Sequence, residues 1–159
     1  MTLEHSSGKP LNLLPKWLMW GLIIVSFIGF LDASWLTVAH YAGLDLNCTI
    51  LKGCEEVTTS EYSVIFGIPL ALLGVFYYLT VLLLSLIYFD TKNQFILKII
   101  PPLTLTGLLA SAWFVYLQLF VIKAICEYCM LSAATSTTLF VFGLFVWKAR
   151  KRKRTGLPQ

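Results

Sequence analysis

The chain has 159 residues, of which 58% are hydrophobic and only 13% are charged, and its mean hydropathy is +0.79. Because a soluble domain of this size keeps about a quarter of its residues charged, this composition excludes an ordinary soluble domain. The charges lie almost entirely between long apolar blocks. We therefore expect a membrane protein.

Four apolar blocks are long enough to cross a bilayer, since a helix needs ~20 apolar residues to span ~30 Å of hydrocarbon. They cover residues 17–39, 65–88, 99–122 and 126–147. The first block is too long and too aromatic for a cleaved signal peptide, whose apolar region is ~7–15 residues. Pro69 and the pair Pro101 and Pro102 fall near the starts of the second and third blocks, where a missing N–H is harmless. The sequence predicts an all-α membrane protein, a four-transmembrane-helix bundle that forms one domain over residues 1–159.

Lysine and arginine are distributed unevenly between the ends of these blocks. Ten of the twelve lie in the N-terminus, the second loop and the basic tail over residues 148–159. The first and third loops keep only Lys52 and Lys123. Basic loops stay in the cytoplasm, so we expect a multi-pass protein of the cell inner membrane with both termini cytoplasmic. Beside a membrane span, the tail favours this topology, and contact with anionic membrane lipid, over a nucleic-acid site.

All four cysteines fall on the opposite, extracytoplasmic side. Cys48 and Cys54 lie in the first loop, and Cys126 and Cys129 form a C-x-x-C at the start of the fourth block. In a bacterium or archaeon this side is oxidising. Four cysteines allow three pairings, and the sequence does not choose among them. Two inert disulfides or a Cys₄ zinc site are alternatives, but a C-x₅-C pair is looser than the usual zinc knuckle, and we expect no metal.

The C-x-x-C lies where a thiolate is stabilised, because a helix N-terminus lowers the pKa of a cysteine. If the fourth helix begins near Cys126, Cys129 lies one turn deeper, ~4.5 Å further into the bilayer and on nearly the same face. Cys126 can then meet a loop cysteine, whereas Cys129 faces the apolar bundle. Its electron acceptor should be lipophilic, and a quinone of the ubiquinone or menaquinone class is the obvious one.

The chain resembles the vitamin K epoxide reductase family, in its prokaryotic stand-alone form. Three stretches carry the resemblance, and with the four spans they cover most of residues 17–147. They are "GFLDASWLTVAHY", then "CTILKGCEEVTTSEYSVIFGIPLALLG", and finally "CEYC". The second is the specific one, with its C-x₅-C pair, Ser60 six residues after Cys54, and F-G-I-P.

The resemblance implies a bundle that encloses a quinone site near the extracytoplasmic surface, capped by the first loop. By this resemblance Cys129 faces the quinone, and Cys54 forms a disulfide with Cys126 during the relay. Cys48 is then the cysteine that first reacts with the protein that brings electrons. Prokaryotic members re-oxidise a thioredoxin-fold, DsbA-like partner, and we expect that partner to be a separate chain. Some animal members place a quinone-contacting tyrosine one turn after the last cysteine, where this chain has Ala133. This difference argues against vitamin K epoxide as the substrate.

Several other residues are candidates for the quinone site. Asp32 is the only acid well inside a span, and an intramembrane ionisable group is a functional hypothesis by default. It could supply protons to the quinone or make a hydrogen bond between helices. Ser60 and Ser63 could bond the capping loop or a quinone carbonyl. Three aromatic residues are further candidates for the quinone pocket: Phe66, Trp113 and Tyr116. Aromatic side chains at helical spacing more often pack in a core than bind a ligand.

The sequence therefore predicts a quinone-dependent thiol oxidoreductase that supports disulfide formation outside the cytoplasm. Electrons would pass from the loop cysteines to the C-x-x-C and then to the membrane quinone. The alternative is a non-catalytic four-span membrane subunit with two extracytoplasmic disulfides. The two hypotheses differ in whether the cysteines are repeatedly oxidised and reduced or stay in fixed disulfides.

Overall fold

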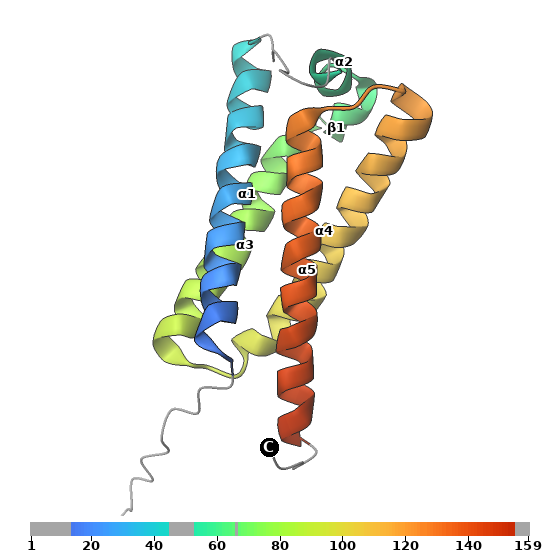
Figure 1. Ribbon diagram of the computed structural model, residues 1–159. Coiled ribbons are helices and arrows are strands. Elements are labelled where there is room, and N and C mark those ends of the chain that lie inside the picture. Colours follow the sequence, from blue (N-terminus) through green and yellow to red (C-terminus); the bar gives the residue numbers. More distant parts are fainter. Residues whose placement is uncertain (1–13, 45–52, 66, 155–159) are drawn as a thin grey trace, which may run out of the picture.

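The computed structural model describes residues 14–44, 53–65 and 67–154, and it contains four long helices (Figure 1). They are α1 (Lys16–Ala42), α3 (Leu70–Thr91), α4 (Ile96–Tyr116), which continues into the π-helical turn η2 (Leu117–Ile122), and α5 (Glu127–Arg154). Each is long and apolar enough to cross a membrane. The prediction of an all-α, four-span bundle is confirmed. Cys48 and Phe66 lie outside the described residues.

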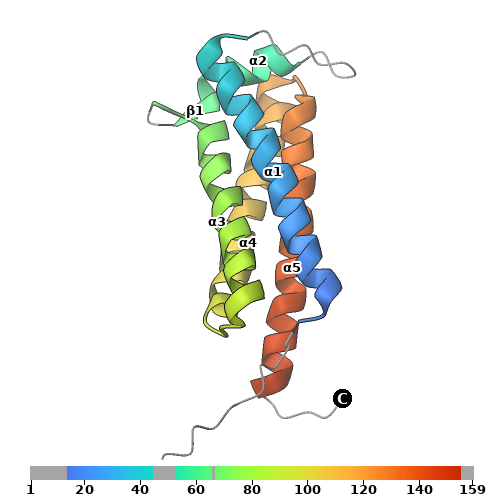
Figure 2. The same cartoon turned by 90° about the vertical axis from the view of Figure 1, so that its left-hand side faces the viewer.

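The long helices end where a residue adopts the left-handed conformation, which stops α-helical hydrogen bonding. Gly43 ends α1 with a φ of 60°, and its N–H donates to the carbonyl of Ala39. Lys92 ends α3 in the same way at a φ of 52°, and Lys123 follows η2 at a φ of 58°. Short connections follow Lys92 and Lys123, whereas a longer one with its own short elements follows Gly43. Successive long helices run in opposite directions (Figures 1 and 2).

Two of the predicted boundaries differ from the structure. The second span begins at Leu70 rather than at residue 65, because Val64–Ile65 (β1) pairs antiparallel with Ile68–Pro69 (β2) in a short hairpin. Pro101 and Pro102 lie inside α4, since this helix already begins at Ile96. They fall beyond the first four residues, whose N–H groups have no intrahelical acceptor in any helix. The two prolines therefore do interrupt the hydrogen-bond ladder of α4.

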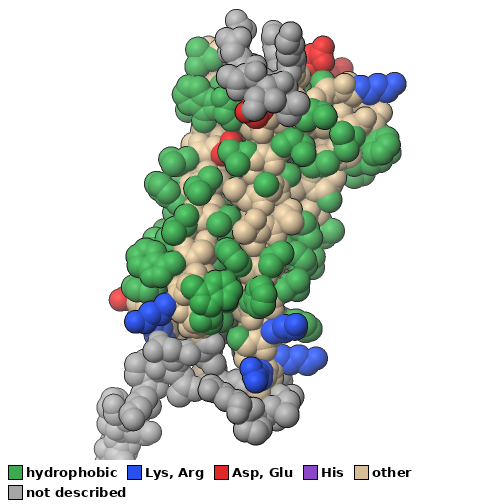
Figure 3. Space-filling model, viewed as in Figure 1, with side chains coloured by type: hydrophobic (Ala, Val, Ile, Leu, Met, Phe, Trp, Pro, Cys, Tyr) green, Lys and Arg blue, Asp and Glu red, His purple; other side chains and the backbone are tan. Residues whose placement is uncertain are grey.

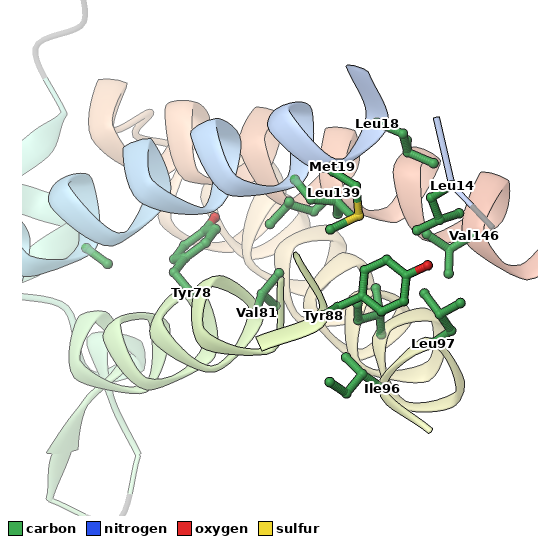
Figure 4. Close-up of a cluster of buried hydrophobic side chains, with 13 residues drawn as sticks. Leu14, Leu18, Met19, Tyr78, Val81, Tyr88, Ile96, Leu97, Leu139 and Val146 are labelled. Carbon is green, nitrogen blue, oxygen red and sulfur yellow. The ribbon is translucent and has the colours of Figure 1, made fainter. Parts of the chain in front are cut away.

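Large side chains fill the half of the bundle that holds the beginning of α1 and the end of α5 (Figure 4). α1 packs mainly against α3 and α5, and α4 packs against α5. Their core includes Leu18, Leu22, Tyr88, Leu97 and Val146, all almost completely buried. Outward-facing side chains are also apolar over the middle of the molecule, and Lys and Arg gather mostly at one end (Figure 3). Both features match a bundle surrounded by lipid.

The opposite end carries the short elements. The helix α2 (Cys54–Thr58), the 3₁₀ turn η1 (Glu61–Ser63) and the β1–β2 hairpin lie between α1 and α3 in the chain. They sit over the end of the bundle where α5 begins (Figure 1). The described part of the first loop thus caps the bundle beside the C-x-x-C.

Candidate functional site at the capped end of the bundle

Cys126 caps the N-terminus of α5. Its carbonyl accepts the N–H of Met130 at 3.0 Å, the first α-helical hydrogen bond of this helix. Its Sγ accepts the N–H of Cys129 at 3.5 Å. A side chain that accepts the N–H three residues on is the geometry of an N-cap. Here the cap atom is sulfur, so the two ends of the C-x-x-C meet through the first turn of the helix.

This position changes the acidity of Cys126. A hydrogen bond from the Cys129 thiol, together with the backbone N–H groups of Cys129 and Tyr128, lowers the pKa of Cys126 to about 7, although burial opposes the shift. An ordinary cysteine has a pKa near ~8.5. A large fraction of Cys126 is therefore thiolate at neutral pH, and the thiolate is the form that attacks a disulfide.

Cys126 also has a partner from the preceding helix. The side-chain Oε1 of Gln118, in η2, accepts the backbone N–H of Cys126 at 3.0 Å. Gln118 is only 1% exposed. The sequence analysis missed this residue; the signal was a single amide in the apolar stretch "YLQLFVI" just before the C-x-x-C.

The loop cysteine Cys54 lies against the same place. It packs in one buried cluster with Val57, Ala124 and Cys126, and Cys129 borders that cluster. Cys54 is disulfide-bonded, whereas Cys126 and Cys129 are free thiols. The structure therefore brings together three of the four cysteines predicted to act, in a state where the C-x-x-C is reduced.

A glycine makes this approach of the loop possible. A Cβ on Gly53 would lie 2.7 Å from the backbone nitrogen of Ile125 and 2.8 Å from its carbonyl oxygen. Such distances are closer than side chains tolerate, so the backbone just before Cys54 contacts the backbone just before Cys126 only because residue 53 has no side chain.

Cys129 lines a cavity of about 450 Å³ between the helices below the cap. That volume lies within the ~300–1,000 Å³ of typical small-molecule sites. Most of the lining is apolar, with side chains such as Leu36, Leu73 and Phe114. Val57 and Thr58 of α2 close it on the loop side. A mostly apolar molecule therefore fits the chemistry of this space.

Most of the polar side chains in the wall carry hydroxyl groups, and His40 adds an imidazole. Ser63, Tyr77, Tyr78, Ser132 and Ser136 all line it. The Tyr78 hydroxyl donates to the carbonyl of Ser132 at 2.7 Å and lies 2.8 Å from Oγ1 of Thr135. Its ring fits between helices because Gly29 of α1 has no side chain, since a Cβ there would lie 2.3 Å from the ring. Tyr78 therefore joins α3 to α5 beside Cys129.

The remaining predicted pocket residues occupy different places. Ser63 lines the cavity, whereas Ser60 donates to the carbonyl of Val57 at 2.7 Å and is not part of the lining. Trp113 and Tyr116 stack on one another on the outer face of α4, at 61% and 49% exposure. They do not line the cavity. The same helix contributes Phe114 instead, one position from Trp113.

Asp32 is 7% exposed, and neither carboxylate oxygen has a hydrogen-bond partner among the described residues. It precedes Ala33 and lies one turn from Leu36, both of which line the cavity. It is close enough to Tyr78 and Cys129 to interact with them electrostatically. A buried carboxylate without partners is costly in its charged form.

Across residues 14–44, 53–65 and 67–154, no group of three or more His, Cys, Asp or Glu side chains gathers as metal ligands would. Cys126 and Cys129 instead contact each other, and Cys129 lines the cavity. Within the part of the chain that the structure describes, the cysteines are arranged for exchange with one another.

Comparison with known proteins gives two findings. The model of the family described as the vitamin K epoxide reductase family matches residues 20–144. A curated relative, the thiol-disulfide oxidoreductase LTO1 of Arabidopsis thaliana, is 36% identical over 118 residues, which are 69% of this chain and 31% of the relative. The chain thus spans about a third of the length of that relative. The family match includes Cys54, Cys126 and Cys129.

Proposed function

Because the chain belongs to the vitamin K epoxide reductase family, we propose that it is a thiol oxidoreductase that passes electrons from a protein dithiol to a membrane quinone. The observation that carries this proposal is the position of Cys129. It touches Cys126 on one side and lines a largely apolar cavity on the other. The name of the relative, a thiol-disulfide oxidoreductase, supports the thiol half of the reaction.

The first part of the relay is thiol–disulfide exchange at the cap. A reduced thioredoxin-fold partner, DsbA-like in chemistry, attacks the loop disulfide through Cys48 and leaves oxidised, so the loop pair becomes a dithiol. The Cys54 thiolate then attacks the disulfide of the C-x-x-C at Cys126, and Cys129 leaves as a thiolate. Cys48 resolves the Cys54–Cys126 disulfide. Each exchange conserves one disulfide and two thiols, so electrons only move inward.

The second part takes place at the cavity. A bound quinone accepts two electrons and two protons and leaves as quinol. Cys129 lies at the cavity wall to deliver the electrons, and Cys126 re-forms the disulfide with it. The Tyr77 hydroxyl lines the cavity and has no hydrogen-bond partner among the described residues, so it can donate to a carbonyl oxygen of the quinone. The apolar lining suits a quinone of the ubiquinone or menaquinone class, and the small Ala133 in the wall leaves room for its ring.

We also propose that Asp32 serves proton transfer. A structural role would need a hydrogen-bond partner, and both oxygens lack one among the described residues. The carboxyl group lies near Tyr78 and Cys129, where it can pass a proton toward the cavity. The basic residues at the opposite end of the bundle support an inner-membrane topology in which the cap and cysteines face the oxidising side.

Turnover with both substrates tests the proposal. Purified protein is mixed with an excess of reduced DsbA-like protein and a soluble quinone, and quinone absorbance is followed. We expect continuous quinol formation with equivalent oxidation of the dithiol, and none with Cys129→Ser. A non-catalytic membrane subunit would give no quinol with the wild-type protein, and that result would refute the proposal.

A further inference from the structure

Gln118 has an unused polar group in the most buried part of the site. Its Oε1 accepts the N–H of Cys126, while its Nε2 is buried and has no hydrogen-bond partner among the described residues. Buried donors without partners are rare in folded proteins because each costs the lost hydration of the group. An amide flip does not remove the problem, since the N–H of Cys126 requires the oxygen on its side.

The local backbone is also unusual. Gln118 belongs to the π-helical turn η2, at the end of the third span. Short π-helical turns are rare and are frequently found at functional sites. The same turn ends at the left-handed Lys123, and three residues later the chain reaches Cys126. Gln118 thus holds the connection that places Cys126 at the end of α5.

The Gln118 side chain fixes the backbone of Cys126 and still has an unpaired donor. Such a donor suits a site where the sulfur of Cys126 changes charge. Cys126 is neutral in a disulfide and anionic as a thiolate, so its need for a hydrogen-bond donor varies during the relay. Charge-assisted hydrogen bonds are about twice as strong as neutral ones. In its buried cluster Cys126 packs with apolar side chains and the two other cysteines, Cys54 and Cys129. The charged group that interacts with it electrostatically is Asp32, an acid, which disfavours a thiolate.

We propose that Gln118 is a positioning residue of the thiol relay: its Oε1 fixes the N–H of Cys126, and its Nε2 donates to the Cys126 sulfur when that sulfur is a thiolate. Gln118 acts through Cys126 and does not itself exchange electrons. This role of Gln118 rests on the proposed function, because it concerns the same thiol relay. Its consequence is that the reduced C-x-x-C is stabilised, which makes the pair a better oxidant of the loop dithiol.

The test measures Cys126 without quinone or partner, so its failure would leave the proposed function standing. In protein carrying Cys48→Ser and Cys54→Ser, ultraviolet thiolate absorbance is titrated against pH. Gln118→Met removes both amide groups at similar length. We expect the pKa of Cys126 to be higher in Gln118→Met than in the parent protein. At a pH above both values, each unit of this rise should destabilise the reduced pair about tenfold, which is a potential about 30 mV more negative.

A second variant separates this role from simple packing. Gln118→Glu keeps an acceptor for the N–H of Cys126 but replaces the donor with a carboxyl group. We expect the pKa of Cys126 to rise in this variant as well. Ser85→Ala, a buried polar change in α3 whose hydroxyl bonds only its own helix, is the matched control and should leave the pKa near 7. A pKa near 7 in Gln118→Glu would overturn the proposal, even if Gln118→Met fails to fold.

Discussion

In the half of the bundle where α1 begins and α5 ends, aliphatic and aromatic side chains fill the space between all four helices (Figure 4). In the capped half, the helices enclose a cavity of about 450 Å³ lined by hydroxyls and one thiol. The orphaned polar atoms Asp32 Oδ1 and Oδ2, Tyr77 OH and Gln118 Nε2 belong to residues in or near that capped half. The packed half stabilises the fold. The capped half contains a cavity and unpaired polar groups, which cost stability and occur in proteins mainly at functional sites.

The sharpest way to test the capped half is to arrest its relay. In Cys129→Ser, Cys126 can still attack Cys54 of the loop disulfide, with Cys48 leaving as a thiolate, but the thiol that would release Cys54 on the helix side is missing. We therefore expect the Cys54–Cys126 disulfide to accumulate. Non-reducing proteolysis and mass spectrometry should recover a peptide joining Cys54 to Cys126. Cys126→Ser is the control and cannot form the link. Recovery of Cys48 joined to Cys126 instead would exchange the two loop roles, and no loop-to-helix link would remove the relay.

The next largest effect concerns Asp32. Asp32→Asn keeps the shape but removes the proton donor, so quinone reduction should slow by about a hundredfold, the contribution typical of a positioned acid. Thiol exchange with the partner should stay at the wild-type rate, because it needs no proton from the cavity. Stopped-flow mixing separates the two steps. Ser26→Ala, a buried polar change on the same helix, is the matched control. Equal slowing of both steps would point to a structural role for Asp32.

The contact of the cap with the bundle gives a smaller effect. Gly53→Ala should push the backbone before Cys54 away from Ile125, and a shift of that kind slows exchange by on the order of ten- to a hundredfold. The rate of electron transfer from a pre-reduced loop pair to the C-x-x-C measures it. Gly21→Ala, where a Cβ meets only the end of the Phe142 ring, should leave this rate unchanged. Wild-type exchange in Gly53→Ala would show that the close approach is not required.

The packed half should show the opposite behaviour. Leu97 is 1% exposed in its core, and Leu97→Ala leaves a cavity that costs roughly 2–5 kcal/mol of unfolding free energy. We expect the same rate of quinone reduction below the unfolding transition. Thermal unfolding of the detergent-solubilised protein gives the first quantity and the turnover assay the second. A large loss of activity without loss of stability would mean that the two halves are coupled.

Much of this organisation could be predicted from the sequence, because apolar length and the positions of charges determine the spans and their order. The position of Cys126 and Cys129 one helical turn apart at the start of the fourth span was equally accessible. The start of the second span was not, since the apolar residues of the β1–β2 hairpin continue the same apolar run. Trp113 and Phe114 illustrate a further limit: these adjacent aromatic side chains leave α4 in directions about 100° apart, and only the packing decides that Phe114 lines the cavity. Gln118 and Gly53 matter through contacts between distant segments, which no local pattern reveals.

The central claim is that Cys129 hands two electrons to a quinone in the cavity. The most direct measurement is a single turnover of reduced protein carrying Cys48→Ser and Cys54→Ser, which leaves Cys126 and Cys129 as the only thiols. Mixed with a quinone of the ubiquinone or menaquinone class, it should yield one quinol per protein, together with a Cys126–Cys129 disulfide. Thiols that stay reduced while the quinone is unchanged would contradict the account.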